Sequence, residues 1–316
     1  MIISASRRTD IPAFYSDWFF NRLRAGFSLV RNPMNAHQIS KITLSRDTVD
    51  CFVFWTKNPS SMLLRHSDDL RQLESDIPFY FQFSVNPYDK SIEPGVPEKK
   101  YIFDTFIQLS KLIGKEKIIW RYDPIIFTDK ISFDYHVKYF EYIAKSLAPY
   151  TNKCVISFLD FYKKTERNMA TIQFYDPSIS QKLELSKRLF DIASSLKLKL
   201  VTCAEMLDLS SIGIRHGQCI DSGLIAHLCG GKVLAAKDKN QRKECGCIES
   251  VDIGAYNTCR HGCLYCYANY SHETVEKHCR LHNPNSPLLF GEVAPDDKIT
   301  VRKMASVIDK QQELLW

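Results

Sequence analysis

Short apolar runs alternate with helical patterns along the first two thirds of the chain. Each run is rich in aromatic or β-branched residues and ends in a polar cluster. The six runs lie at 1–10, 50–59, 78–87, 117–124, 154–162 and 198–206. Between them, apolar residues recur at every third or fourth position, as in a helix with one buried face. The clearest stripes are Ile102, Phe106, Leu109 and Ile113, then Val137, Phe140, Ile143 and Leu147, then Leu185, Leu189, Ile192 and Leu196.

This alternation predicts an α/β fold with a parallel sheet, because strands joined by helices pair in parallel. Nearly continuous apolar strands indicate a sheet that is covered on both faces. No glycine-rich phosphate loop follows the first run, where the sequence is SASRRTD, so the Rossmann fingerprint is absent. We therefore favour a partial or complete (β/α) barrel of about six parallel units over an open, doubly wound sheet.

Three regions are expected. Residues 1–228 would form the barrel, and residues 229–282 a cysteine-rich segment that folds over the barrel mouth. Residues 283–316 read as a proline-interrupted connector and a final helix. The apolar residues expected to dock this helix on the outside of the barrel are Val301, Met304, Val307 and Ile308.

The ends of the predicted strands are polar. Functional side chains of a barrel gather at the C-terminal ends of its strands, so these residues would line one mouth. A polar loop is common in any protein, and the prediction therefore depends on all six ends together. The residues that we expect to act on a substrate are Arg7, Arg8, Asp10, Asp123 and Tyr162.

Composition and charge narrow the class of protein only a little. Hydrophobic residues make up 45% and charged residues 25%, as in ordinary globular proteins. No apolar stretch is long enough to span a membrane, and no signal-peptide pattern follows the first residues, so a cytoplasmic protein without membrane contact is expected. The net charge of +6 permits an anionic substrate or nucleic acid, although a solvated surface explains it more simply.

The cysteines change this picture. Nine of the eleven follow residue 200, and in a reducing compartment such crowding is typical of metal or redox sites. In CRHGCLYC, Gly262 eases a tight turn that lets Cys259, Cys263 and Cys266 face one point. Structural zinc usually has four ligands, so zinc would need Cys245, Cys247 or His261 as the fourth. An iron–sulfur cluster with one open iron accounts for three cysteines more economically.

This loop, with Tyr265 before the last cysteine, resembles the signature loop of the radical S-adenosylmethionine superfamily. The resemblance implies a 4Fe–4S cluster on Cys259, Cys263 and Cys266, with S-adenosylmethionine on the fourth iron. One electron from an external low-potential donor would then cleave S-adenosylmethionine to a 5′-deoxyadenosyl radical. In that superfamily the loop follows the first strand, whereas here it follows the sixth unit, so a C-terminal segment would have to return across the barrel mouth.

The whole chain also resembles an uncharacterised bacterial family that carries such a cysteine cluster at its C-terminus. The stretches that carry this resemblance are SASRRTDIPAFY, FWTKNP, KDKNQRKECGC and DIGAYNTCRHGCLYCYAN.

If S-adenosylmethionine binds, Arg121 or Lys57 could pair its carboxylate. Glu205 could accept from the ribose or the amino group, Asn269 could orient the cofactor, and Tyr265 could stack on adenine. Four further cysteines are enough for a second, fully ligated 4Fe–4S cluster or a zinc ion: Cys203, Cys219, Cys245 and Cys247. The alternative is that Cys203 and Cys219 are small buried core residues.

Two functions follow. The first is a radical S-adenosylmethionine enzyme that acts on an unknown small-molecule or macromolecular substrate. The second is a non-catalytic zinc or iron–sulfur module on a barrel scaffold, which would bind nucleic acid or a protein partner.

Overall fold

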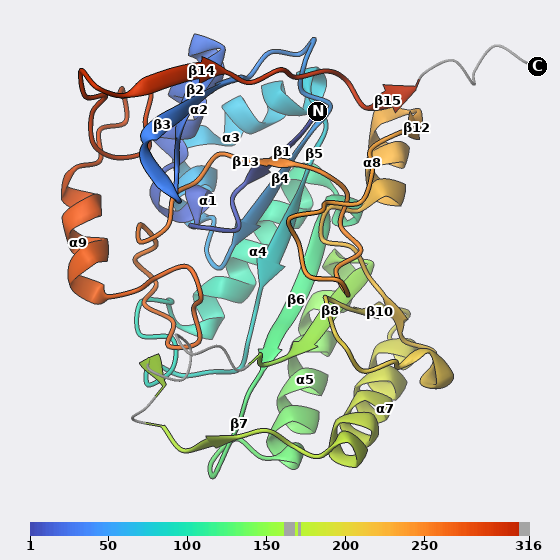
Figure 1. Ribbon diagram of the computed structural model, residues 1–316. Helices are drawn as coiled ribbons and strands as arrows, with labels where there is room; N and C mark the ends of the chain where they lie inside the picture. Colours follow the sequence, from blue (N-terminus) through green and yellow to red (C-terminus); the bar gives the residue numbers. More distant parts are fainter. Residues whose placement is uncertain (161–167, 170–171, 310–316) are drawn as a thin grey trace, which may run out of the picture.

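The protein, described by a computed structural model over residues 1–160, 168–169 and 172–309, has an α/β fold built on an eight-stranded sheet (Figure 1). All neighbouring strands of this sheet are parallel. In spatial order the strands are β11 (Arg215–His216), β10 (Lys199–Thr202), β8 (Lys153–Phe158), β6 (Ile118–Ile125), β5 (Phe79–Ser84), β4 (Cys51–Thr56), β1 (Ile2–Ala5) and β13 (Val251–Asp252). The predicted α/β class and all six predicted strands are confirmed.

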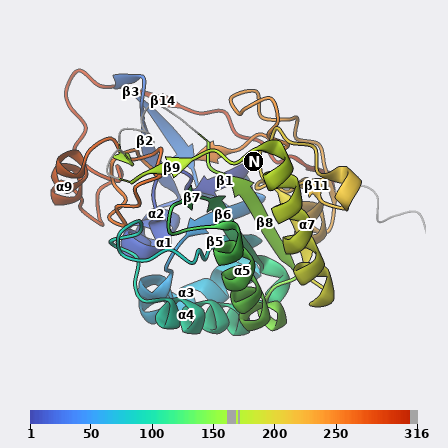
Figure 2. The ribbon, with the colours of Figure 1, turned by 90° about the horizontal axis from the view of Figure 1, so that it is seen from below.

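The helices between the strands cover one face of the sheet, as Figure 2 shows for α3, α4, α5 and α7. These helices span Ser60–Asp76, Lys99–Ile113, Phe133–Leu147 and Ile179–Ser195. The three predicted apolar stripes lie on α4, α5 and α7. Their ends follow the local sequence: Ser132 and Ser178 cap the N-termini of α5 and α7, and Gly114 ends α4. The shorter helices of the described residues are α1 (Ile11–Phe14), α2 (Ser16–Ala25), α8 (Ser222–Cys229) and α9 (His272–Arg280).

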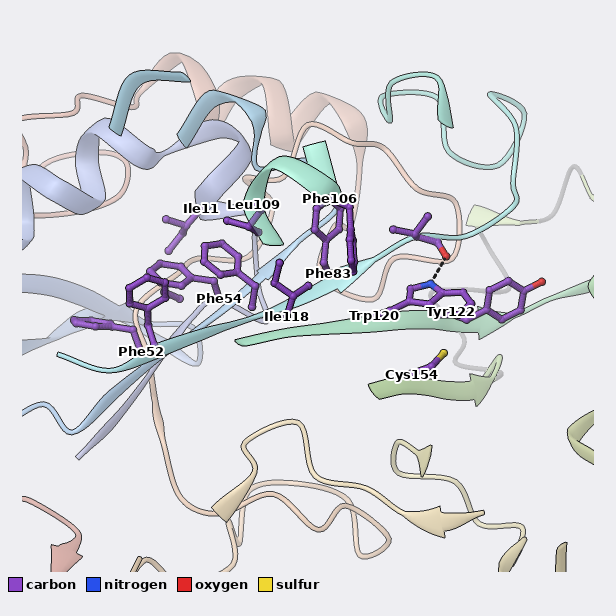
Figure 3. Close-up of a cluster of buried hydrophobic side chains, with 14 of the residues drawn as sticks. Ile11, Phe52, Phe54, Phe83, Phe106, Leu109, Ile118, Trp120, Tyr122 and Cys154 are labelled. Carbon is purple, nitrogen blue, oxygen red and sulfur yellow. Dashed lines mark hydrogen bonds between the residues drawn. The ribbon is translucent and has the colours of Figure 1, made fainter. Parts of the chain in front are cut away.

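The strands bury different residues on their two faces. Phe52, Phe54, Phe83 and Trp120 point toward the helices and form the main core, part of which is drawn in Figure 3. We call this side the helix-covered face. On the opposite side, Val53, Tyr80, Ile119 and others pack against the segment that carries Cys219, Cys245 and Cys247. The sheet is therefore buried on both faces, which explains its continuous apolar strands.

Further along each strand, the second side becomes polar. Trp55, Gln82, Arg121, Ser157 and Cys203 follow the apolar residues of their strands at period two. We call this side the cavity face, because most of these polar ends line the cavity described below.

Among the described residues, three small sheets flank the main one. In the first, β3 (Asn35–Thr43) lies between β2 (Phe27–Asn32) and β14 (Lys298–Val301). The other two pair β7 (Phe127–Thr128) with β9 (Phe174–Tyr175) and β12 (Lys232–Val233) with β15 (Ile308–Asp309). No helix in the described part of the chain has the length and apolar character needed to cross a bilayer.

The predicted final helix is wrong for the described residues up to 309. Val301 ends β14, Ile308 begins β15, and Met304 and Val307 lie in the extended connection between them. The β-branched run Ile299–Val301 favours a strand, and β3 offers it a free edge. Asp50, just before β4, accepts from Ser306 Oγ at 2.5 Å and from the Val307 amide at 2.9 Å.

Candidate metal and cofactor site

A cavity of about 730 Å³ lies at the C-terminal ends of the parallel strands. We call it the mouth cavity. All seven cysteines predicted to bind metal line it, as do Arg7, Arg8, Asp10, Lys57, Arg121, Asp123 and Tyr265. The structure therefore brings most of the predicted site residues to one place, although they come from segments far apart in the sequence.

The position of the cysteine loop, residues 259–266, follows from the pairing of β13 with β1. Val251 and Asp252 of β13 lie opposite Ile3 and Ser4 of β1, in parallel register. The Asp252 carboxylate accepts from Ser4 Oγ at 2.7 Å, from Ser6 Oγ at 2.6 Å and from the Arg7 amide at 2.8 Å. The chain after β13 thus leaves the sheet beside the turn that follows the first strand, and from there it reaches the cysteine loop.

His261 and Asp10 hold the cysteine loop to this end of the sheet. The two side chains are almost fully buried, and His261 Nε2 lies 2.8 Å from Asp10 Oδ2. The same carboxylate accepts from the Lys57 amide at 2.7 Å and from the Ala13 amide at 3.0 Å, where it caps α1. Asp10 thus holds two backbone amides and the His261 ring, which positions the loop. It also lines the mouth cavity, and its expected action on a substrate stays a prediction.

The β5–α4 connection clamps the loop from the other side. The Gly95 amide donates to His261 O at 2.8 Å, and the Leu264 amide donates to Ile92 O at 3.1 Å. A Cβ atom at Gly95 would lie 2.6 Å from Arg260 O and 2.7 Å from His261 O, both backbone atoms. Only glycine therefore fits this approach without a shift of the loop.

The three loop sulfurs lie in a low-dielectric environment. Burial raises the pKa of Cys259 well above its usual range and that of Cys263 to about 12, although Lys57 acts in the opposite direction on Cys263. Buried thiols of this kind ionise when a cation binds them. Among the described residues, no three cysteine sulfurs come within 4.8 Å of one another, so they do not converge on the centre of a single ion.

Behind Tyr265, a buried carboxylate joins two lysines. Glu93, 1% exposed, lies 2.8 Å from Lys57 Nζ and 2.7 Å from Lys99 Nζ, and it also accepts from the Tyr265 hydroxyl. Burial alone would raise the pKa of Glu93, but the two lysines outweigh it and lower the pKa to about 2. Lys57 Nζ also lies 5.3 Å from the centre of the Tyr265 ring. The network fixes a positive charge beside Cys263.

Arg121 does not offer the free fork that a substrate carboxylate needs. Its Nε and Nη2 atoms both bind Asp123, and its Nη1 lies 3.2 Å from Gln82 Oε1 and 2.9 Å from Cys219 Sγ. Burial opposes the charge, yet Cys219 and Asp123 raise the pKa of Arg121 well above its usual range. Both cations predicted to pair the cofactor carboxylate, Arg121 and Lys57, thus already have carboxylate partners.

Arg7 and Arg8 also line the mouth cavity. The Arg7 guanidinium lies 5.4 Å from the centre of the Trp55 ring, and that of Arg8 lies 5.2 Å from the centre of the Tyr256 ring. Arg7 donates to Ser250 Oγ at 3.2 Å, while its buried Nε has no partner among the described residues. Arg8 Nε also lies 3.9 Å from Asp252 Oδ1, so Arg7 is the arginine of this pair with a guanidinium nitrogen left to meet an anionic ligand.

Two predicted site residues of the described chain do not line the mouth cavity. Glu205 lines neither described cavity, and its carboxylate accepts from the Phe158 and Leu207 amides at 3.2 and 3.4 Å. Asn269 donates to Cys259 O at 2.8 Å and lines a second cavity of about 850 Å³, which shares Cys259, His261 and Cys263 with the mouth cavity. Tyr162 lies outside the described residues. The predictions for Glu205 and Asn269 as direct cofactor contacts are not supported by these positions.

Sequence reasoning missed Asp252, Glu93 and Trp55. Asp252 stands in a two-residue strand, which is too short to show a pattern. Glu93 is a single acidic residue in the connection SIEPGVP, and nothing local indicates that it is buried. Trp55 could have been found, because it precedes Lys57 by two positions and shares its side of the strand.

Comparisons with solved structures and with curated proteins give no informative match. One crystal structure is described as "a putative alpha-L-fucosidase from Bacteroides thetaiotaomicron", and it has 16% sequence identity with this chain and a TM-score of 0.23. The match covers 74% of this chain and 86% of the other. That likeness is too low to carry an argument. A search of curated proteins finds no match.

The informative match is to a family model. Residues 2–268 match the family described as Domain of unknown function (DUF1848). The matched range runs from β1 through the cysteine loop and includes all seven cysteines of the mouth cavity. Because it covers most of the chain, the protein belongs to the DUF1848 family.

Proposed function

We propose that this protein is a radical S-adenosylmethionine enzyme. One observation carries the proposal: three cysteines of one short loop line a cavity at the C-terminal ends of parallel strands, beside the turn that follows the first strand. The late position of the loop in the sequence had been the main departure from the superfamily. The pairing of β13 with β1 removes that difficulty, because the two turns are neighbours in space.

The donor set fits an iron–sulfur cluster better than a single zinc ion. Zinc–sulfur bonds of about 2.3 Å would place ligand sulfurs about 3.8 Å apart. No three cysteine sulfurs of the described chain come within 4.8 Å of one another. A cubane presents its irons at separate corners, so it accepts thiolates that are spread more widely. His261, the histidine considered as a fourth zinc ligand, is bound to Asp10.

Cys259, Cys263 and Cys266 would hold the cluster, leaving one iron for S-adenosylmethionine. When bound, and with one electron from an external low-potential donor, this pair would supply methionine and a 5′-deoxyadenosyl radical that takes a hydrogen atom from the substrate. Lys57 places positive charge beside the cysteines, and His261 with Asp10 fixes the loop. Arg7 would bind an anionic group, and Trp55 and Tyr256 shield that part of the mouth cavity from water.

The proposal has consequences for fold and setting. The main sheet would be a partial barrel with the cysteine segment across its mouth, which is supported by β11 and β13 at opposite edges of the sheet. A cytoplasmic location would keep the eleven free cysteines reduced. The enzyme would need an external low-potential electron donor. Its substrate can be small or macromolecular, nucleic acid included.

The test is S-adenosylmethionine cleavage by anaerobically reconstituted protein. We expect the reduced wild type to form 5′-deoxyadenosine, and Cys259→Ala, Cys263→Ala and Cys266→Ala each to reduce this to background. Cys229→Ala is the matched control, since Cys229 does not line the mouth cavity, and it should keep full activity.

No 5′-deoxyadenosine from a fully loaded, reduced protein would contradict the proposal. One bound zinc and no iron at the cysteine loop would instead favour the non-catalytic module that binds nucleic acid or a protein partner.

A further inference from the structure

The mouth cavity has a second group of thiols that the proposed function does not use. We propose that Cys203, Cys219, Cys245 and Cys247, the second thiol set, form a separate, fully thiolate-ligated site for a thiophilic metal group. Four sulfur ligands are the donor set of a 4Fe–4S cluster, which accepts thiolates that are spread more widely than those around a single zinc ion. The proposal concerns metal binding alone and does not require radical chemistry.

The four residues come from three separate segments and meet at one wall. Cys203 follows β10, Cys219 follows β11, and Cys245 and Cys247 stand in the connection that leads to β13. Cys203 Sγ lies 3.0 Å from Cys219 Sγ. Cys247 Sγ accepts from the Cys219 and Ile220 amides at 3.2 and 3.3 Å. Cys245 lines the same cavity and packs in the same buried cluster as Cys219 and Cys247. The four residues therefore gather at one cavity, with direct sulfur contacts between the Cys203, Cys219 and Cys247 segments.

The backbone around Cys219 is held from the cavity face of β5. Cys219 O accepts from the Tyr80 hydroxyl at 2.6 Å and from Gln82 Nε2 at 2.9 Å, and both side chains are buried. The Gly217 amide donates to Thr202 O at 2.8 Å, and a Cβ at Gly217 would lie 2.8 Å from that same oxygen. The segment is thus fixed in place, as ligands of a metal site need to be.

A positive charge faces the thiols. Arg121, which is 5% exposed, places Nη1 2.9 Å from Cys219 Sγ, while Asp123 and Gln82 fix the orientation of its guanidinium. Four thiolates around a metal group leave net negative charge, and a buried guanidinium in contact with one sulfur offsets part of it. This gives Arg121 a positioning role toward the second thiol set, where the sequence had suggested one toward the cofactor carboxylate.

The competing view, that these are ordinary core cysteines, fits two other residues. Cys51 and Cys154 are fully buried within strands, and neither lines the cavity. The sulfur contacts described for them are with the next residue's carbonyl oxygen, at 3.5 and 4.0 Å. The second thiol set instead lines a cavity and has sulfur contacts across segments, which core packing does not require.

Metal content separates the second thiol set from the cysteine loop. Anaerobically reconstituted wild type is expected to bind about eight irons, as two 4Fe–4S clusters. Replacing all three loop cysteines by alanine should leave one metal group, and so should the double variant Cys245→Ala/Cys247→Ala. Combining the two sets of substitutions should leave none, whereas Cys229→Ala should bind as much as wild type.

These readouts do not depend on S-adenosylmethionine cleavage, so the metal site can stand if the proposed function fails. Cys245 and Cys247 are chosen because they lie in a connection outside the main sheet, and gel filtration with a thermal melt checks that the variants fold. Crystals of wild type, measured at the iron and zinc absorption edges, locate the metal without any substitution. Equal metal content in wild type and Cys245→Ala/Cys247→Ala, or a Cys203–Cys219 disulfide with no metal there in anaerobic protein, would overturn the proposal.

Discussion

Trp120 and Arg121 are neighbours in β6, yet they belong to two differently built regions. Trp120 lies on the helix-covered face, fully buried, stacked on Phe140 with ring centres 5.0 Å apart. Arg121 lies on the cavity face, where it holds Asp123, Gln82 and Cys219. One face is closed by aromatic packing, the other by ion pairs and thiols around a cavity. Stability and chemistry are thus separated across the thickness of a single sheet.

The largest expected effect compares two tryptophans, one on each face. Trp120→Ala removes a buried ring and the hydrogen bond from Nε1 to Val85 O at 3.0 Å, so it should lower the free energy of unfolding by about 3–5 kcal/mol. Trp55→Ala, on the cavity face, should cost about 1 kcal/mol, because Trp55 is only half-buried, and should mainly affect activity. Urea unfolding measures both, and equal losses would remove the distinction between the faces.

Gly95→Ala tests whether the β5–α4 connection positions the cysteine loop. The new methyl group would meet the backbone oxygens of residues 260 and 261 and push the cysteine loop outward. A displacement of about 1 Å should reduce 5′-deoxyadenosine formation roughly a hundredfold, with a smaller loss of stability. The control is Gly223→Ala on α8, where the nearest atom to a new Cβ is 3.4 Å away. Unchanged activity in Gly95→Ala would show that the clamp does not position the loop.

Glu93→Gln probes the buried charges of the cavity face. The substitution leaves Lys57 and Lys99 without their carboxylate, so it should destabilise the protein by about 1–3 kcal/mol at neutral pH. The pKa of Glu93 lies below its ordinary value of 4.5, at about 2, so its stabilising contribution is complete above pH 4.5 and is lost as the pH falls toward 2. Between pH 4.5 and pH 2, the free energy of unfolding should therefore change less with pH in the variant than in wild type.

His136, a buried residue of α5, gives a second and smaller test of pH-dependent stability. Its Nδ1 accepts from the Tyr122 hydroxyl at 2.8 Å, and its Nε2 donates to Ile126 O at 2.9 Å, as in a neutral ring. Burial lowers the pKa from 6.5 to about 4, so stability is complete above pH 6.5 and falls as the pH drops toward 4. His136→Gln should remove this slope, whereas the exposed His272→Gln should keep it. An unchanged slope in His136→Gln would assign the titration to another group.

The sequence predicted the helix-covered side of the fold well, because its signals are local. Continuous apolar runs became β4, β5, β6 and β8, and the periodic stripes became α4, α5 and α7. The cysteines of the loop and of the second thiol set were also identified correctly as neighbours of the polar strand ends.

What the sequence could not give were contacts between distant segments. β13 has two residues, and only its pairing with β1 places the cysteine loop. Residues 298–301 form a strand because β3 accepts them, although the same apolar residues also fit a helical stripe. Arg121 and Asp123 lie on one side of β6 by its period of two, so their pairing was foreseeable. The hydrogen bonds of Glu205 to the Phe158 and Leu207 amides could not be predicted from the sequence.

The bond between Ser4 and Asp252 joins residues 248 positions apart. The chain is synthesised from its N-terminus, so the other strands of the main sheet are made before β13 can dock against β1. Until then the cysteines of the loop and of the second thiol set do not share a cavity. Under the proposed function, cluster insertion would therefore be one of the last steps of maturation, after nearly the whole polypeptide has been made.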